Sequence, residues 1–383
     1  MKKTTLIYLV SMAVLLLATL VFYGLYNSQV SSAQLTATIA STATTQNHGV
    51  AEHHANTVAS IANMLRFWVV FFLTLTAGAG IFAVMEFLIL PALSFSRVGA
   101  LTRVTYYEAL LQPFTLIVFF MAIAAIFITA FVPFNTFGDD TKMYRDVALS
   151  FALMFVLVIM VFATGKVIDE EIENRTMLTL MSKPVARWQV ILGKYLGVIC
   201  LVFVTMFVCT LLGASCAWLR YFSDQRIDLD VASPMARQLM FWDNDRAILA
   251  MLPAFVLQFM EISTLAAIST AIATRFSLAL NMTVIVLLYI IANLTRYVSL
   301  LHMGSPWQGL AEGTSYLLPY LSNFDLNSCL VYRNFSMGDH FVAGAPTWGQ
   351  IWEYVGLACT YGLLYIGAAL CLAVAMFRNR ELT

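Results

Sequence analysis

The chain has 383 residues, of which 61% are hydrophobic and 11% are charged, and its 21 basic and 21 acidic residues balance. Soluble globular domains carry about 25% charged residues, so this composition excludes an ordinary soluble domain and indicates that lipid surrounds most of the chain. Nucleic-acid-binding proteins usually present a basic face, so the balanced charge gives no reason to expect a nucleic-acid partner. Six cysteines without a CxxC spacing give no support to a zinc or redox site.

Eight apolar stretches are long enough, or nearly so, to span a membrane, since a helix needs about 20 apolar residues to cross the hydrocarbon core. The sequence therefore predicts an all-α polytopic membrane protein with about eight transmembrane helices. The eight stretches are Leu6–Tyr26, Phe67–Leu90, Phe114–Phe134, Val147–Thr164, Leu192–Leu219, Ile248–Ala273, Leu278–Leu294 and Ile351–Phe377. The seventh is the shortest, and residues 295–300 would have to extend it.

The first two stretches are separated by a polar connection, residues 27–63, and we predict that residues 1–100 and 101–383 form two regions. The first stretch is expected to be an uncleaved signal anchor, because its apolar run exceeds the roughly 7–15 residues of a signal-peptide core. A cleaved signal peptide is the alternative, since residues 33–40 are small. The polar connection holds His48, His53 and His54 but no supporting ligand cluster, so no metal site is predicted.

Lysine and arginine near the ends of the spans predict their orientation, because cytoplasmic loops are enriched in these residues. If Lys2 and Lys3 lie inside, eight crossings return the C-terminus, with Arg378 and Arg380, to the same side. Slightly more than half of the basic residues then lie on the inner side. We therefore expect both termini in the cytoplasm.

Two segments outside the spans are expected to lie along the membrane surface. Residues 104–111 have the pattern of a short surface helix, and Pro113 can begin the span that follows, since proline is tolerated in the first helical turn. Residues 317–324, around Pro319, predict a helix on the outer interface, where aromatic residues gather.

The connection between the fourth and fifth stretches, residues 165–193, is here called the elbow. It carries four acidic and four basic residues in one run. Thr176 can cap a short helix, and Pro184 can begin a second one. In the second helix we expect four residues to face the bilayer: Trp188, Ile191, Leu192 and Tyr195. The pattern indicates a helix–bend–helix on the cytoplasmic surface that is suited to a soluble partner; a solvated interfacial loop is the alternative.

Two glycines at the end of the elbow, Gly193 and Gly197, form a G-x-x-x-G sequence. This spacing permits close contact between two helices. The sequence does not identify the partner helix.

Two carboxylates fall within predicted spans and are candidates for a translocation path. Glu261 lies in the middle of the sixth stretch, and Glu86 lies near the inner end of the second. A carboxylate at bilayer depth costs about 2.5–3.5 kcal/mol, so such residues are often functional. Glu261 would line a path or pair with a base such as Arg296; the alternative for both is a protonated or hydrogen-bonded packing residue.

The elbow resembles the corresponding loop of type-2 ABC transporter permeases, the membrane subunits of many bacterial exporters. The resemblance rests on these residues: Glu170, Glu171, Glu173, Arg175, Thr176, Leu178, Leu180, Lys183, Pro184, Val185, Arg187, Gly193 and Lys194. Residues 318–321 and 377–382 are similar to other parts of that family, so the resemblance covers about residues 106–383. The first hundred residues depart from its plainest members.

The resemblance implies a six-span permease core preceded by two additional spans, in a bacterial inner membrane. It also implies a second permease chain, identical or different, and a separate ATP-binding subunit that docks on the elbow. The residues that would couple the chain to that subunit are Glu170, Glu171, Arg175, Thr176, Lys183, Pro184 and Arg187.

The chain has no phosphate-binding loop of the form G-x-x-x-x-G-K-[ST]. Its two Gly-Lys pairs fail, because Met160 and Trp188 stand where the first glycine is required. ATP hydrolysis is therefore expected in a partner, and no cofactor or enzymatic activity is predicted here. Two alternatives stay open: a proton-coupled secondary transporter using Glu261 and Glu86, and a membrane enzyme or assembly scaffold, although no Ser–His–Asp or HExxH pattern is visible.

Overall fold

The computed structural model describes residues 68–134, 140–173, 186–224, 244–298, 319–332 and 346–378, with a few isolated positions elsewhere. The chain divides into two compact units, Met1–Val84 and Met85–Thr383. In the described ranges the chain is helical and no β-strand occurs, so the all-α prediction is confirmed. The predicted division at residue 100 stays a prediction.

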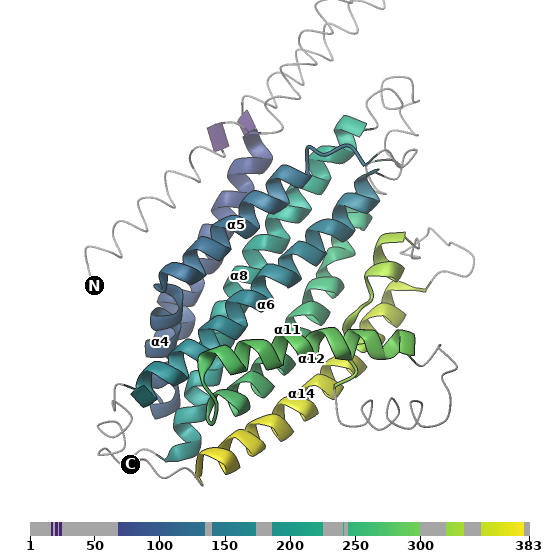
Figure 1. Ribbon diagram of the computed structural model, residues 1–383. Helices are drawn as coiled ribbons and strands as arrows, with labels where there is room; N and C mark the ends of the chain where they lie inside the picture. The colour runs from purple at the N-terminus through teal and green to yellow at the C-terminus, as the bar shows by residue number, and fades with distance from the viewer. Residues whose placement is uncertain are drawn as a thin grey trace, which may run out of the picture. The chain divides into compact units, whose positions relative to one another are not determined.

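The second unit contains the elements on which a functional site can be built (Figure 1). Its elements are η1 (Met85–Ile89), α3 (Leu90–Leu93), α4 (Arg97–Leu110), α5 (Pro113–Thr129), α6 (Asp140–Glu173), α8 (Arg187–Asp224), α11 (Met251–Ala273), α12 (Leu278–Val298), η2 (Leu321–Phe324), η3 (Ser328–Tyr332) and α14 (Trp348–Arg378). The elements η1 and η3 are π-helical, and η2 is a 3₁₀ turn.

Five helices of the described chain are long and apolar enough to cross a membrane, and a bent pair, α4 with α5, makes up to six. The five are Trp68–Leu93, Asp140–Ile168, Arg187–Tyr221, Asn244–Ala273 and Trp348–Phe377. A polytopic membrane protein is thereby confirmed. The apolar part of α12, Leu278–Leu294, is shorter than these spans, and the first predicted stretch lies outside the described residues apart from isolated positions. The count of eight stays a prediction.

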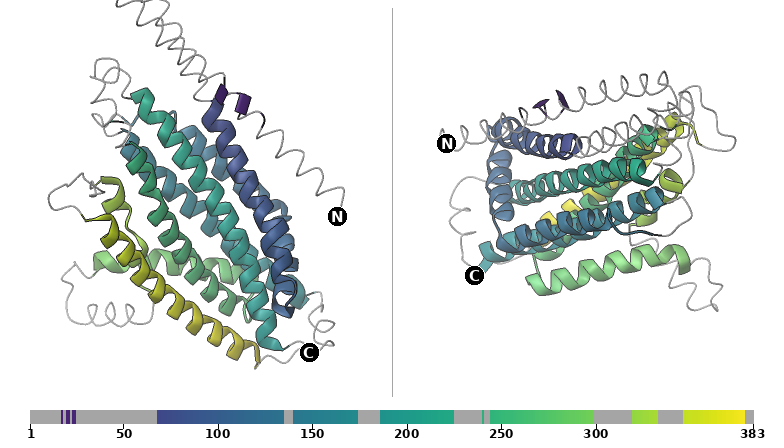
Figure 2. Two further views of the ribbon diagram at one scale, coloured as in Figure 1. Left: turned by 180° about the vertical axis from the view of Figure 1, so that it is seen from behind. Right: turned by 90° about the horizontal axis from the view of Figure 1, so that it is seen from above.

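Helices α5, α6, α8 and α11 run side by side, and α12 crosses α6 and α11 obliquely (Figures 1 and 2). One apolar core is shared by α5, α6, α8, α11, α12, η2 and α14. We call the end of this bundle where α6 ends and α8 begins the elbow end, and the opposite end, where α5 ends and α6 begins, the far end.

A tight turn and a bend shape the start of this unit. Ser96 caps α4 by accepting a hydrogen bond from the backbone N–H of Gly99 at 3.0 Å. Pro113 begins α5, and the axis turns by 67° between α4 and α5. The predicted helix over 104–111 is thus confirmed as part of a longer helix. Because of the bend, α4 lies against the beginning of α8.

At the far end, Arg220 joins α8 to the loop after α5. Its Nη1 donates to the carbonyls of Thr129 and Ala130 at 3.3 and 3.2 Å, and its Nη2 lies 3.7 Å from Asp140. A guanidinium at these carbonyls stabilises the end of α5, where the helix dipole is negative. This buried side chain therefore fixes the far ends of three helices: α5, α6 and α8.

Two local predictions were wrong. Ile191 and Tyr195 do not face the bilayer: both are buried, and the Tyr195 hydroxyl donates to the Ser263 carbonyl at 3.2 Å. Leu321 and Phe324 do not belong to the predicted interfacial helix either: they lie in the 3₁₀ turn η2 and are fully buried against the bundle. In each case the apolar side chains pack on neighbouring helices, which sequence spacing alone does not reveal.

Candidate functional site

The base of the elbow is packed unusually tightly. Added Cβ atoms on Gly193 and Gly197 would lie 2.7 Å from Leu101 Cβ and 2.6 Å from Thr105 Cβ. The G-x-x-x-G sequence therefore has its partner helix, which is α4. Close approach of two helix backbones is what small residues at this spacing allow.

A buried lysine joins the two arms of the elbow, which are the end of α6 and the beginning of α8. The Nζ of Lys194, on α8, donates to the carbonyl of Val167, on α6, at 2.8 Å. Lys194 is 3% exposed, so this charged hydrogen bond is screened little by water. This hydrogen bond thus connects the end of α6 to the beginning of α8.

A second apolar cluster lies at the elbow end and connects α8 to two further helices. Its buried members are Val190, Ile191, Ala271, Ala373 and Phe377. Nearby, Arg275 donates from Nε and Nη2 to the Met376 carbonyl at 3.3 and 3.2 Å. The beginning of α8 and the ends of α11 and α14 thus form one packed unit.

Four of the seven residues predicted to couple the chain to an ATP-binding subunit lie outside the residues that the structure describes. Glu170 and Glu171 lie in the last turns of α6, and Arg187 is the exposed first residue of α8. The remaining four lie outside the described residues: Arg175, Thr176, Lys183 and Pro184. The roles predicted for all seven stay predictions.

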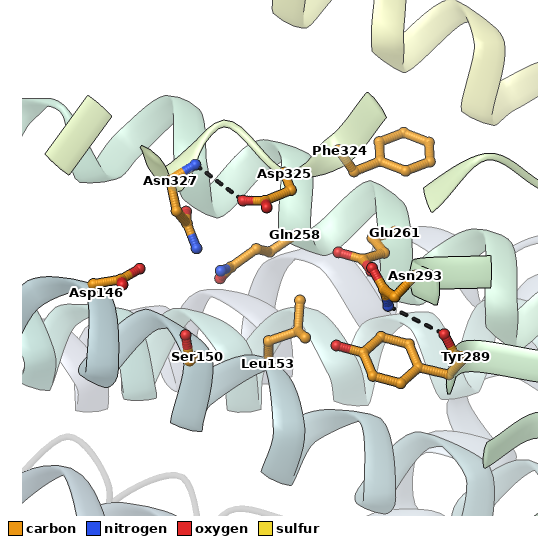
Figure 3. A pocket seen from close by; sticks show the side chains of 10 residues that line it. All are labelled: Asp146, Ser150, Leu153, Gln258, Glu261, Tyr289, Asn293, Phe324, Asp325 and Asn327. Carbon is orange, nitrogen blue, oxygen red and sulfur yellow. Dashed lines mark hydrogen bonds between the residues drawn. The ribbon is translucent and has the colours of Figure 1, made fainter. Parts of the chain in front are cut away.

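A polar cavity of about 280 Å³ lies inside the bundle (Figure 3). Its lining comes from α6, α11, α12 and the segment around η2, and consists of Asp146, Ser150, Leu153, Gln258, Glu261, Tyr289, Asn293, Phe324, Asp325 and Asn327. The residues from α6 and α11 belong to the halves of those helices nearer the far end. The lining contains three carboxylates and no lysine, arginine or histidine. This is an unusual interior for a protein embedded in lipid.

Glu261 and Gln258 are the buried polar groups that make the cavity chemically distinctive. They are 5% and 3% exposed, and as residues three apart on α11 they share one face. Within the described part of the chain, no hydrogen bond or ion pair reaches the Glu261 carboxylate, and the Gln258 side-chain oxygen has no partner. Asp325 lies near enough to Glu261 for two negative charges to repel each other. Both side chains point into the cavity in Figure 3.

The remaining walls are ordered by hydrogen bonds of their own. Asn293 donates to the Tyr289 carbonyl at 3.1 Å, and Asp325 accepts from the backbone N–H of Asn327 at 3.1 Å (Figure 3). The wall formed by η2 is fixed by α14. There the backbone N–H of Tyr320 donates to the Tyr361 hydroxyl at 3.0 Å, and the Tyr354 hydroxyl donates to the Asn323 carbonyl at 2.8 Å.

Comparison with known protein families matches residues 4–382 to the family described as "ABC-2 family transporter protein". The chain belongs to the ABC-2 transporter family. A comparison with curated proteins gives no match. Members of the ABC-2 family are membrane components of transporters and not themselves catalytic, and in an ABC transporter an ATP-binding partner accompanies them. The resemblance carried by the elbow is confirmed, and the match extends over the first hundred residues as well.

In this ABC-2 protein, Glu86 does not contribute to the cavity. It lies in η1 and accepts a hydrogen bond from the Tyr107 hydroxyl, on α4. Arg103, one turn before Tyr107, stacks over that ring at 5.7 Å. Of the two predicted intramembrane carboxylates, Glu261 therefore lines a cavity and Glu86 links η1 to α4. The side chain of Arg296, the base suggested for Glu261, lies outside the described residues.

Sequence reasoning missed most of the cavity. Asp146 directly precedes the predicted span 147–164, and Asp325 directly follows the segment 317–324 predicted on the outer interface, so the sequence assigns neither of them to a site. A usable signal was present, because polar residues recur on one face of otherwise apolar helices: Gln258 and Glu261 three apart, Tyr289 and Asn293 four apart. Such spacing in a membrane helix marks a face that turns away from lipid.

Proposed function

We propose that this chain is the permease subunit of an ATP-driven exporter, in which a separate ATP-binding subunit acts on the elbow and the cavity lies on the translocation path. The observation that carries the proposal is the family match over residues 4–382, together with an elbow between α6 and α8, the two longest helices of the described ranges. In this proposal the elbow faces the cytoplasm of a bacterial cell, both termini lie on the same side, and two permease chains act together.

The lengths of α6 and α8 support the role of the elbow. With 34 and 38 residues, these helices are about 51 and 57 Å long at about 1.5 Å per residue. A hydrocarbon core is about 30 Å thick. Both helices therefore extend well beyond it, and a soluble subunit can reach the elbow without entering lipid.

The continuity of α6 supports a link between elbow and cavity. Asp146 and Ser150 line the cavity, and the same unbroken helix runs on to Glu173 at the elbow. The hydrogen bond from Lys194 to Val167 makes α8 follow α6. A force applied at the elbow would tilt both helices and change the cavity at a distance.

The test is ATP-dependent transport in vesicles that contain the full chain and its co-purified ATP-binding partner. We expect Glu171→Lys and Arg187→Glu each to reduce ATP-driven transport at least tenfold and to weaken retention of the partner. Arg246→Glu, a charge reversal at the far end, is the matched control; it should retain both ATP-driven transport and the ATP-binding partner. The proposal fails if no ATPase is retained by the tagged chain, or if the elbow variants transport normally.

The orientation is tested separately with a cysteine introduced by Ser182→Cys. We expect a membrane-impermeant thiol reagent to modify it in inside-out vesicles and not in intact cells. Modification from the outside would overturn the cytoplasmic assignment of the elbow. Transport driven by a pH gradient without ATP would favour the proton-coupled alternative, with Glu261 as the proton carrier.

A further inference from the structure

We infer that the cavity binds an organic ammonium ion that carries an apolar or aromatic group. The inference rests on the proposed function in one respect: it takes the cavity to be part of the translocation path. The recognition chemistry itself is argued from the cavity alone.

The charge of the ligand follows from Glu261. Glu261 is 5% exposed, and its carboxylate points into the cavity and has no hydrogen bond or ion pair within the described chain. Buried charges are normally paired. The other two acidic lining residues, Asp146 and Asp325, add no positive charge. A cation in the cavity would supply the missing partner.

The second polar contact follows from Gln258. Its side-chain oxygen is buried, has no partner and belongs to the same face of α11 as Glu261. A carbonyl oxygen accepts hydrogen bonds, so its natural partner is an N–H donor. An ammonium group can donate to the Glu261 carboxylate and the Gln258 oxygen together, because it carries up to three N–H bonds.

The apolar part of the ligand follows from the aromatic walls and the size. Tyr289 and Phe324 line the cavity, and aromatic faces attract ammonium ions and their alkyl groups. A volume of about 280 Å³ lies near the lower end of small-molecule sites, roughly 300–1,000 Å³. This space is larger than a bare ion requires.

The geometry disfavours an inorganic ion. Calcium and magnesium take six or more oxygen ligands at about 2.0–2.6 Å. Among the described residues, no group of three or more acidic, histidine or cysteine side chains is placed to hold a metal ion. The three carboxylates of the cavity are therefore spread along its walls, an arrangement that suits an extended ligand.

The experiment is equilibrium binding of radiolabelled phenethylammonium to the full chain in nanodiscs of phosphatidylcholine, which is zwitterionic and has no net charge, without nucleotide or partner. Empty nanodiscs set the baseline for partition into lipid. We expect saturable binding that unlabelled phenethylammonium displaces and that the neutral phenethyl alcohol displaces at least tenfold less well. Potassium and magnesium chloride should not displace it at matched ionic strength.

Variants connect the binding to the cavity. Glu261→Gln should weaken binding at least tenfold, and Gln258→Leu about threefold to fivefold. Glu353→Gln, the same chemical change at an exposed position of α14, is the matched control and should bind as the unchanged chain does. If Glu261→Gln does not fold, Tyr289→Leu replaces it, with an expected loss of threefold or more.

Four results would overturn the inference: no saturable binding, equal displacement by the neutral alcohol, unchanged binding by the cavity variants, or displacement by magnesium. The last would favour an inorganic cation. The proposed function is judged by a different measurement. If binding fails while Glu261→Gln still lowers ATP-driven transport, the organic ammonium ligand is rejected, but the cavity remains part of the proposed translocation path. If binding succeeds while the elbow variants transport normally, the ATP-driven mechanism is rejected, but the ligand site in the cavity is retained.

Discussion

The elbow end and the cavity belong to the same bundle, but they differ in how their interior groups are satisfied. At the elbow end, Gly193 and Gly197 bring two helices into close contact, and the buried Lys194 has a carbonyl partner. In the cavity, the equally buried Glu261 and Gln258 point into open space without partners. The same helices take part in both regions, since α6 and α11 run from one to the other.

The difference separates a region whose buried polar groups pair within the chain from one whose buried polar groups face a cavity. Protein interiors are close-packed, and a void without partner atoms loses contact energy. A tight region transmits displacement because its parts cannot move independently. Substitutions at Gly197, Lys194, Tyr361 and Tyr354 test this difference between the two regions.

The largest effect is expected from Gly197→Leu. Its Cβ would lie 2.6 Å from Thr105 Cβ and 2.9 Å from the Thr102 carbonyl oxygen, so α4 and α8 would have to separate. We expect a loss of about 3 kcal/mol in the free energy of unfolding, since overpacking typically costs about 1–3 kcal/mol. The measurement is unfolding of the purified chain in detergent. Gly356→Leu is the matched control, because a Cβ there meets nothing within 4 Å; equal losses for the two variants would contradict the tight contact.

An intermediate effect is expected from Lys194→Met. It removes the charged hydrogen bond to Val167, and such bonds contribute about 1.5–3 kcal/mol. We expect unfolding to be easier by about 2 kcal/mol and ATP-driven transport per folded molecule to fall severalfold, since the two arms of the elbow are no longer joined. Lys142→Met, at the far end of α6, is the control for loss of a lysine. Normal transport by Lys194→Met would show that the arms need no such connection.

The smallest effect is expected from Tyr361→Phe. This change removes the hydroxyl that accepts from the Tyr320 backbone N–H, a contribution of about 1 kcal/mol to stability. Tyr354→Phe removes the bond to the Asn323 carbonyl and should cost a similar amount. The free energies of unfolding of the two single variants and of the double variant measure both contributions. A double variant no weaker than either single one would mean that η2 is held by other contacts.

Much of the fold could be predicted from apolar runs, because the cost of exposing backbone groups to lipid forces such runs into helices. The first and last residues of α6 were harder to predict, since its polar ends lie beyond the apolar run 147–164 from which the span was predicted. The oblique path of α12 was not predictable, because tertiary packing sets it and composition does not. The same holds for Leu321 and Phe324, whose burial depends on a groove formed by other helices.

The candidate site could be predicted in part. Glu261 stood out because a carboxylate in a long apolar run is costly. Asp146 and Asp325 did not, since each lies beside polar sequence that usually means solvent. The elbow was identified by its motif, but its mechanical connections through Lys194 and α4 depend on contacts between segments distant in the sequence.

The burial of Leu321 and Phe324 has an electrical consequence. A carboxylate-lined chamber attracts sodium ions and protons, and an open passage through it would discharge the membrane potential. In the proposed translocation path, the two apolar side chains of η2 would oppose such a leak, because an ion must shed its hydration shell to pass an apolar constriction. A molecule leaving past η2 would then have to displace Leu321 and Phe324, so the same turn would insulate the membrane and control release.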